Sequence, residues 1–588
     1  MKYSNKESVH ILIELLIKKG VRHVVLSPGS RNAPLLVSFT REKRIKHYMI
    51  LDERSAAFFA LGISQARNEA VALVCTSGSA VLNYSPAISE AWYQRLPLIV
   101  ISADRPQEWI DQDDSQTIRQ KDILKNIVKH SCQLPYDLSD EDQKWYTVRT
   151  INETLNIALS ERMGPVHINI PFKEPLYLTK SYNDEVRNIE TINLNNRINE
   201  DYILELLHLI KKCKKVMILC GFGTSNKKVN LFINLLSQNL NTVVLTENIS
   251  NISGTNCLST IDRLLAGIPT EREKDFAPDL LISFGGALVS RRIKAFLRKY
   301  KIKSHWNIDP GNIPADTFRC MTKHIKTTPE IFFEGLYNVE KYNKNLFTNK
   351  YEMDLFSTLD KSKDLLYYKN LWKSIDEITD KKHHEYIAKT KWSDLKAFSI
   401  ILKKIPNKSF LQISNGTAIR YTQLFRKKQT INYACNRGTS GIDGSTSTAL
   451  GASIINTRYN SNSITTLITG DLSFMYDSNA LWNSYLNGNF KIIVIMNGGG
   501  GIFRYIPGPG TLPELEECFE TKQKTNIQGM AKAASLEYYS AKNENELISV
   551  LPDFLKKSEK TSLLEIKTPK LLNGKILNDY FNFLSLQE

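Results

Sequence analysis

Short apolar runs alternate with helical stretches along most of this chain. Residues 7–20 and 53–68 have the apolar spacing of helices, and Gly20 is placed to end the first. Strands that are apolar on both faces and alternate with helices predict a parallel sheet covered on both sides. In the first part of the chain, the runs that predict such strands are 21–26, 46–51, 70–76, 97–102 and 166–170.

The same alternation occurs twice more, which predicts an α/β protein with three doubly wound parallel-sheet domains. We expect these domains at residues 1–182, 200–335 and 395–588. A polar, Asn-rich stretch separates the first two and is typical of a linker. Residues 336–394 are charged and weakly periodic, which predicts a helical connector.

Composition narrows the class of protein. The 588 residues are 42% hydrophobic and 23% charged, as in ordinary globular proteins, and the net charge is +16. The basic residues are scattered and no basic run is interleaved with aromatics, so we expect attraction of small anions and no nucleic-acid partner. The eight cysteines form no C-x-x-C pair. No apolar run reaches the roughly 18 residues of a membrane span, so we expect a cytoplasmic protein with no membrane partner.

Asp471 stands where an acid requires a partner. It follows Gly470 at the end of an apolar run, and Asn497 follows the next such run along the chain, one strand–helix–strand unit later. Residues 472–488 between them have a helical pattern, and Gly498 to Gly501 follow Asn497. The set predicts an Mg²⁺ site that also receives a diphosphate beside a helix N-terminus. The alternative for Asp471 alone is a tight turn and a helix cap.

Glu53 is a second acid placed directly after a predicted strand, at the start of a helix. An acid in a first helical turn commonly stabilises the helix dipole.

Several stretches resemble known enzymes. "GDL" at 470–472 with the later Asn497 resembles the metal and diphosphate motif of thiamine diphosphate enzymes, from which Leu472 and Met496 depart. "SPGSRNAPL", "ADRPQEWID" and "NRGTSGIDG" resemble the 2-succinyl-5-enolpyruvyl-6-hydroxy-3-cyclohexene-1-carboxylate synthase (SEPHCHC synthase) family of menaquinone biosynthesis. In that family "GDL" is usual, so Leu472 supports the resemblance.

The resemblance implies a transferase that decarboxylates 2-oxoglutarate and adds the resulting carbanion equivalent to isochorismate. It implies the cofactor thiamine diphosphate, bound together with Mg²⁺ or Mn²⁺. The pyrimidine of the cofactor would bind the first domain and its diphosphate the third. The implied metal ligands are Asp471, Asn497 and the Gly499 carbonyl, and the implied catalytic acid is Glu53. The implied substrate-binding residues are Arg31, Arg105, Gln116, Arg420 and Arg437. The implied cofactor-binding residues are Glu53, Ile442, Asp471, Leu472, Ser473, Asn497, Gly499, Gly500, Ile502 and Phe503.

Two further positions depart from the family pattern, since Gly416 stands where a serine is common and Arg291 where a lysine is common. The resemblance also implies a homodimer or homotetramer, because Glu53 and the metal ligands lie in separate domains. One alternative is another thiamine diphosphate enzyme, such as acetohydroxyacid synthase or a 2-oxoacid decarboxylase. A second is a basic nucleic-acid-binding or regulatory protein built on this fold.

Overall fold

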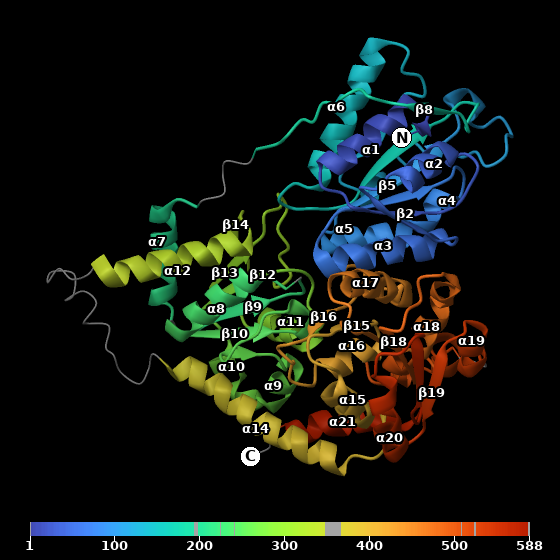
Figure 1. Cartoon of the computed structure of the whole chain (residues 1–588). Helices are drawn as coiled ribbons and strands as arrows, with labels where there is room; N and C mark the ends of the chain where they lie inside the picture. Colours follow the sequence, from blue (N-terminus) through green and yellow to red (C-terminus); the bar gives the residue numbers. More distant parts are fainter. Residues whose placement is uncertain are drawn as a thin grey trace.

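The computed structural model describes residues 2–192, 198–223, 225–239, 241–346, 366–506, 508–521 and 525–585. In these residues the chain forms three parallel sheets of six strands each and one short antiparallel pair. Each large sheet carries helices on both faces, so the predicted fold class is confirmed (Figure 1). The expected boundaries at 182, 200, 335 and 395 stay predictions, and residues 193–197 and 347–365 lie outside the described residues.

The first sheet is ordered β3-β2-β4-β5-β7-β6, and β1 pairs with β8 in the separate antiparallel pair. Helices α1, α2 and α6 bury one face, while α3 and α5 bury the other. The strands are β1 (Lys2–Ser4), β2 (His23–Leu26), β3 (Lys46–Met49), β4 (Val71–Cys75), β5 (Leu98–Asp104), β6 (Ser131–Gln133), β7 (Val166–Pro171) and β8 (Thr179–Ser181). The helices are α1 (Glu7–Lys18), α2 (Ala33–Arg41), α3 (Glu53–Arg67), α4 (Ala80–Asn83), α5 (Ser85–Gln94) and α6 (Glu141–Ala158).

The central sheet has the order β11-β10-β9-β12-β13-β14, and helices α7 to α12 belong to this part of the chain. Its strands are β9 (Val216–Cys220), β10 (Thr242–Thr246), β11 (Cys257–Leu258), β12 (Leu280–Phe284), β13 (Ser304–Ile308) and β14 (Lys323–Ile325). The helices are α7 (Glu200–Lys212), α8 (Lys227–Asn239), α9 (Ile261–Gly267), α10 (Glu273–Phe276), α11 (Arg291–Lys299) and α12 (Pro329–Leu346).

The third sheet has the order β16-β15-β17-β18-β20-β19. Helix α14 (Tyr367–Lys389) leads into it and packs against both α9 and the C-terminal α21. The strands are β15 (Phe410–Ile413), β16 (Asn432–Ala434), β17 (Thr465–Gly470), β18 (Phe490–Met496), β19 (Glu537–Ala541) and β20 (Ser562–Lys567). The remaining helices are α15 (Asp394–Lys404), α16 (Thr417–Thr422), α17 (Ser445–Tyr459), α18 (Asp471–Tyr476), α19 (Ile527–Ala533), α20 (Glu544–Phe554) and α21 (Leu572–Leu584).

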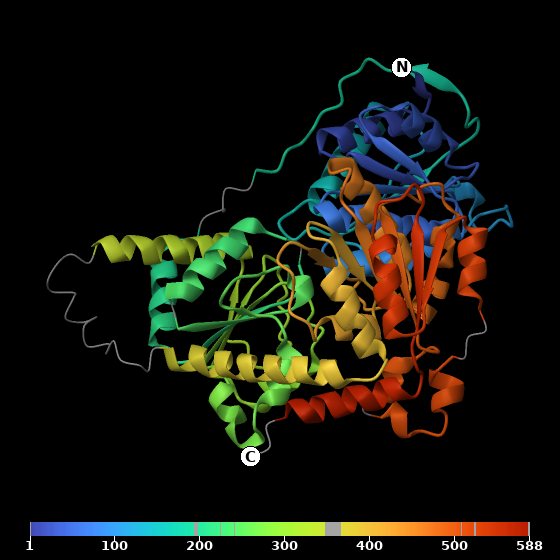
Figure 2. The same cartoon turned by 60° about the horizontal axis from the view of Figure 1, so that its bottom comes forward.

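Helix α3 of the first domain lies on α17 of the third, and one apolar core runs through both (Figures 1 and 2). Glycines allow this close approach, because a Cβ on Gly444 would collide with the Phe58 ring. Ser55 and Ser447 also share a hydrogen bond of 2.8 Å between their hydroxyls. The two domains of one chain are therefore joined along the helix that begins with Glu53.

Two local predictions in the third domain are wrong. The helical pattern at 472–488 gives only α18 and a 3₁₀ turn (Ser478–Trp482). Helix α18 ends before Asp477, whose buried carboxylate accepts hydrogen bonds from the Ser447 backbone N–H (2.6 Å) and hydroxyl (2.8 Å) of α17. The glycine run leads into a single 3₁₀ turn (Gly501–Arg504) and no α-helix N-terminus, because three of its glycines have positive φ.

Candidate functional site

Asp471 lies at the carboxyl edge of the third sheet. Gly470 is in register with Ile495, so Asp471 comes level with the end of β18, where Asn497 follows. The carboxylate is only 3% exposed and accepts hydrogen bonds from the N–H groups of Leu472 (2.8 Å), Gly498 (3.1 Å) and Gly499 (2.8 Å). Burial raises its pKa, and these three N–H groups act in the opposite direction.

The glycine loop after β18 has a shape that side chains would prevent. Gly498, Gly499 and Gly500 have φ of 86°, 80° and 57°. A Cβ on Gly499 would lie 2.6 Å from the Thr521 carbonyl oxygen, and one on Gly500 would lie 2.7 Å from the Phe519 carbonyl oxygen. Beside the loop, apart from Gly470 and its two chain neighbours, no atom of the described residues lies within 4 Å of the place where a Gly470 Cβ would be. The loop is therefore fixed in shape next to open space at the sheet edge.

Asn497 is held by an acid that the sequence did not single out. Its amide Nδ2 donates to Asp394 Oδ2 (2.9 Å), and no group in the described part of the chain donates to its Oδ1. Asp394 Oδ1 accepts from the Thr568 hydroxyl (2.6 Å). Burial raises the pKa of Asp394 to about 6, and the nearby Asp471 adds to the rise. Asp394 begins a helix after the capping residue Ser393, so its sequence context indicates only a helix start.

These groups fit a hard divalent cation. One carboxylate and one amide oxygen are the donors that Mg²⁺ takes from proteins, with phosphate and water completing its octahedron. No group of three His, Cys, Asp or Glu side chains suited to a metal occurs in the described ranges. A cation at this edge would therefore depend on phosphate oxygens as well as on Asp471 and Asn497.

The other predicted cofactor-binding residues surround this edge. Ser473 Oγ donates to the Ile442 carbonyl (2.6 Å) and so ties the loop before α17 to α18. Ile442 is 41% exposed, an unusual position for an aliphatic side chain inside a folded loop. The Phe503 and Phe519 rings are in contact, tilted by 59° with their centroids 5.4 Å apart. Leu472 and Ile502 are half-buried.

Glu53 begins α3 in the first domain and is half-buried. Burial raises the pKa of its carboxyl, and the neighbouring Asp52 adds to the rise. Asp52 is the helix cap, because it accepts from the Arg54 N–H (2.9 Å) and from Asn479 Nδ2 (2.6 Å). Within the described residues, no other side chain forms a hydrogen bond or ion pair with the Glu53 carboxylate. Asp52 therefore caps α3, and Glu53 is a separate acid beside the cap.

Arg31, Arg105 and Gln116 come together at the carboxyl edge of the first sheet. Arg31 donates to the Phe172 carbonyl (2.9 Å), and burial followed by the charge of Arg105 lowers its pKa. Arg105 donates to the Ser115 carbonyl (2.9 Å), directly before Gln116. The buried Nε of Arg105 has no hydrogen-bond partner in the described residues. An orphaned cationic N–H fits an anionic ligand.

Arg420 and Arg437 form a second cationic group on the third domain. Arg420 donates to the Gly416 carbonyl (2.5 Å), and Arg437 donates to Asn415 Oδ1 (3.1 Å). Burial lowers the pKa of Arg420, and the charges of Arg437 and Arg291 add to this effect. The Nε of Arg437 is buried and has no partner in the described ranges.

The central domain reaches this second group through α11, a contribution that sequence reasoning missed apart from Arg291. Glu247 follows β10 and accepts from the N–H groups of Val289 and Ser290 (2.8 Å each), directly before Arg291. Burial raises the pKa of Glu247 to about 7, and the charge of Arg437 opposes this rise. Lys294 lies one turn further on, and its pKa is lowered first by burial and then by Arg437.

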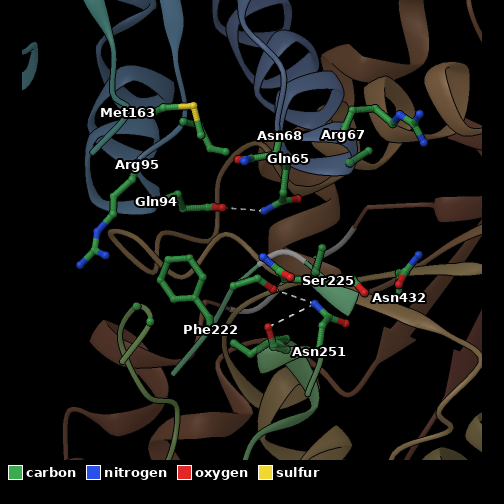
Figure 3. A pocket seen from close by; sticks show the side chains of 18 of the residues that line it. Gln65, Arg67, Asn68, Gln94, Arg95, Met163, Phe222, Ser225, Asn251 and Asn432 are labelled. Atoms are coloured by element: carbon green, nitrogen blue, oxygen red, sulfur yellow. Dashed lines mark hydrogen bonds between the residues drawn. The ribbon is translucent and has the colours of Figure 1, made fainter. Parts of the chain in front are cut away.

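The predicted residues thus form two groups within one chain. Glu53, Arg31, Arg105 and Gln116 belong to the first domain, whereas Asp471, Asn497, Arg420 and Arg437 belong to the third. No hydrogen bond or ion pair joins the two groups in the residues that the structure describes. A cavity of about 640 Å³ does lie where the three domains meet, but its lining includes none of these eight residues (Figure 3).

Three family models match the chain. They are the thiamine pyrophosphate enzyme N-terminal domain (residues 7–123), middle domain (205–345) and C-terminal domain (414–566). The SEPHCHC synthase of Porphyromonas gingivalis is 43% identical, and the match covers 99% of this chain and 98% of that protein. The SEPHCHC synthase of Flavobacterium psychrophilum is 42% identical, with 98% of each covered.

The fold resembles that of the crystal structure of benzoylformate decarboxylase from Polynucleobacter necessarius. The TM-score is 0.70 with 15% identity, and the match covers 96% of this chain and 98% of that one. In the described residues no helix is long and apolar enough to cross a membrane.

Proposed function

Because the chain belongs to the SEPHCHC synthase family of thiamine diphosphate enzymes, we propose that it converts 2-oxoglutarate and isochorismate to 2-succinyl-5-enolpyruvyl-6-hydroxy-3-cyclohexene-1-carboxylate and CO₂. The bound cofactor supplies the carbon nucleophile for this reaction. The observation that carries the proposal is the pair of arginine groups at the two sheet edges, each with one buried and one half-buried member, since both substrates carry several carboxylates.

The third domain would hold the diphosphate through a divalent cation. Asp471, the Asn497 amide oxygen and the Gly499 carbonyl would be its protein ligands, with Mg²⁺ or Mn²⁺ as the ion. Asp394 supports this assignment because its bond to Nδ2 leaves the Asn497 oxygen turned to the ion. Ile442 would support the cofactor between its two ends.

Glu53 would hold and exchange a proton at the cofactor's aminopyrimidine. A carboxylate with few hydrogen bonds and a raised pKa suits proton exchange with the cofactor. In the described residues no hydrogen bond or ion pair joins Glu53 to the metal side within one chain, which supports an active site built from the first domain of one subunit and the third of another. The active unit would then be a homodimer or homotetramer.

The arginines would bind and orient the two acids. Arg31 and Arg105 with Gln116 would contribute one cationic wall, and Arg420 with Arg437 the other. Arg105 and Arg437 each have a buried Nε–H without a partner in the described residues, and a carboxylate oxygen would satisfy it.

The direct test is to incubate the purified protein with thiamine diphosphate, Mg²⁺, 2-oxoglutarate and isochorismate and to follow CO₂ and the adduct mass. We expect both products, and no adduct when either substrate is omitted. Pyruvate, which lacks the distal carboxylate, should be a poor donor. Equal use of pyruvate and 2-oxoglutarate would favour an acetohydroxyacid synthase-like activity and contradict the proposal.

A further inference from the structure

The loop of residues 435–442, here called the Arg437 loop, follows β16 and carries both Arg437 and Ile442. Its own domain holds it through Asn415. The Asn415 amide donates to the carbonyls of Asn436 (2.5 Å) and Gly441 (2.7 Å), and its oxygen accepts from Arg437 (3.1 Å). These bonds hold the two ends of the loop together but leave the N–H groups in its middle to be satisfied elsewhere.

A single carboxylate of the first domain satisfies them. Glu90 on α5 is 1% exposed, and its Oε1 accepts from the Gly438 N–H (2.6 Å). Its Oε2 accepts from the Thr439 N–H and the Thr439 hydroxyl (2.7 Å each). A Cβ on Gly438 would lie 2.6 Å from the Glu90 carbonyl oxygen, so the loop approaches the α5 backbone more closely than a side chain permits.

Two glutamines extend this contact. Gln94, one turn after Glu90, donates to its Oε1 (2.5 Å). Gln65 on α3 donates to Gln94 Oε1 (2.8 Å), the bond drawn in Figure 3, and to the Cys435 carbonyl (3.3 Å). The Arg437 loop is therefore bonded at its beginning and its middle by side chains of the first domain.

We propose that Glu90 is a positioning residue that sets the place of Arg437, and through it the binding of a substrate carboxylate. The inference rests on the proposed function for the role of Arg437, but the loop contact itself does not. Glu90 suits this task because an ionised carboxylate only accepts hydrogen bonds, and all four groups that face it are donors. In a buried site such charge-assisted bonds hold the loop more firmly than neutral ones.

The chemistry of the four donors defines the test variant. In Glu90→Gln the shape is kept, but the amide NH₂ must face at least one N–H or O–H donor. Losing bonds of this kind should raise the Michaelis constant of the substrate bound by Arg437 on the order of tenfold or more, with the thiamine diphosphate dissociation constant little changed. Glu90→Asp, which keeps the charge, should lie between the parent and Glu90→Gln.

A double-mutant cycle separates positioning from general structural support. If Glu90 acts through Arg437, adding Glu90→Gln to Arg437→Ala should cost little more than Arg437→Ala alone. Combined with Arg420→Ala, which lies outside the loop, the same change should be close to additive. Glu42→Gln is the matched control, because Glu42 is a buried carboxylate of the same domain that bonds Tyr3 and Arg44. It should lower the melting temperature and leave both Michaelis constants unchanged.

A measurement without substrates keeps this inference separate from the proposed function. Hydrogen–deuterium exchange of peptides covering 435–442 should be faster in Glu90→Gln than in the parent, with unchanged exchange in peptides covering 466–476. If loop exchange is faster in Glu90→Gln but the parent protein makes no adduct, the proposed function is wrong and Glu90 is still the residue that positions the loop. Unchanged loop exchange, or an additive cycle with Arg437→Ala, would overturn the inference.

Discussion

The two acids assigned to the cofactor, Glu53 in the first domain and Asp471 in the third, stand in opposite surroundings. Asp471 is almost fully buried and accepts three backbone hydrogen bonds, while Asp394 holds the neighbouring Asn497. Glu53 is half-buried, and no other side chain bonds its carboxylate in the described residues. A metal ligand has to be fixed before its ion arrives, whereas a proton-transferring acid has to remain available.

The difference also bears on assembly. The third domain presents its oxygens at one edge within one chain, but in the described residues no hydrogen bond joins Glu53 of the first domain to any of them. Each edge carries one arginine whose buried Nε–H has no partner in the part of the chain that the structure describes. We therefore infer that the first domain supplies one half of a site that a second subunit completes.

Removing Asp471, the acid that hydrogen bonds hold in place, should have the largest effect, a loss of metal-dependent cofactor binding. Loss of a residue that only orients a metal ligand typically costs about 10–100-fold in metal affinity. Asp471→Ala removes the ligand itself, so the loss of affinity should exceed that range. Calorimetric titration with thiamine diphosphate and Mg²⁺ checks this. The protein without cofactor should stay folded with a modestly lower melting temperature, because three backbone N–H groups lose their acceptor. Cofactor affinity equal to that of the parent would show that the metal binds elsewhere.

Replacing Glu53, the acid that remains available, should lower the turnover number and leave cofactor affinity nearly unchanged. Glu53→Gln should lower the turnover number by about 10²–10⁴-fold, the usual worth of a positioned proton transfer, with little change in cofactor affinity. Asp52→Asn is the matched control, since Asp52 caps the same helix. It should cost stability of about 1 kcal/mol or less and leave the turnover number close to the parent. Equal rate losses in both variants would point to damage of α3 and not to catalysis.

Replacing Asp394, which holds Asn497, should have an intermediate effect on metal affinity. Asp394→Asn leaves the Asn497 amide free to turn its NH₂ towards the metal, and we expect metal affinity to fall about 10–100-fold. Thr568→Val removes a hydroxyl donor on the far side of Asp394 and should cost less. Titration of Mg²⁺ at saturating thiamine diphosphate measures both. An Asp394→Asn protein with parental metal affinity would contradict the orienting role.

The smallest effect concerns Asp477. Its carboxylate joins the end of α18 to α17, the helix that packs against α3, which begins with Glu53. Burial raises its pKa to about 7 in the folded protein, above the value of about 4 expected in the unfolded chain. The folded state therefore binds this proton more tightly. The stability that this bound proton gives the folded state is fully present below pH 4, and it is lost as the pH rises through 7. Relative to the parent, Asp477→Asn should gain stability between pH 5 and pH 8 in urea unfolding, and a constant difference would contradict the assignment.

The alternation of apolar runs was enough to predict the three parallel sheets, because strands buried on both faces have a plain signature in sequence. It also placed Asp471 and Asn497 at one edge, since the carboxyl ends of parallel strands meet there. The helix predicted at 472–488 failed because Asp477 bonds to α17, a contact that only the folded chain creates.

Two of the residues that sequence reasoning missed, Glu90 and Asp394, are buried acids within helices. Glu90 lies in the middle of α5, and Asp394 follows a serine cap, so each has the sequence context of an ordinary helix residue. Their donors lie in other parts of the chain, Gly438 for the one and Asn497 for the other. Nothing in the local pattern could have predicted these pairings, since they depend on how the domains pack.

Subunit complementation tests the central claim, that Glu53 of one chain serves the metal site of another. Glu53→Gln and Asp471→Ala proteins, each inactive alone, are mixed under conditions in which differently tagged subunits are shown to exchange. Random pairing makes half of the dimers mixed, and each mixed dimer has one intact site, so about a quarter of the parental activity should return. No recovery despite proven exchange would mean that each chain builds its own complete site, and would contradict the account.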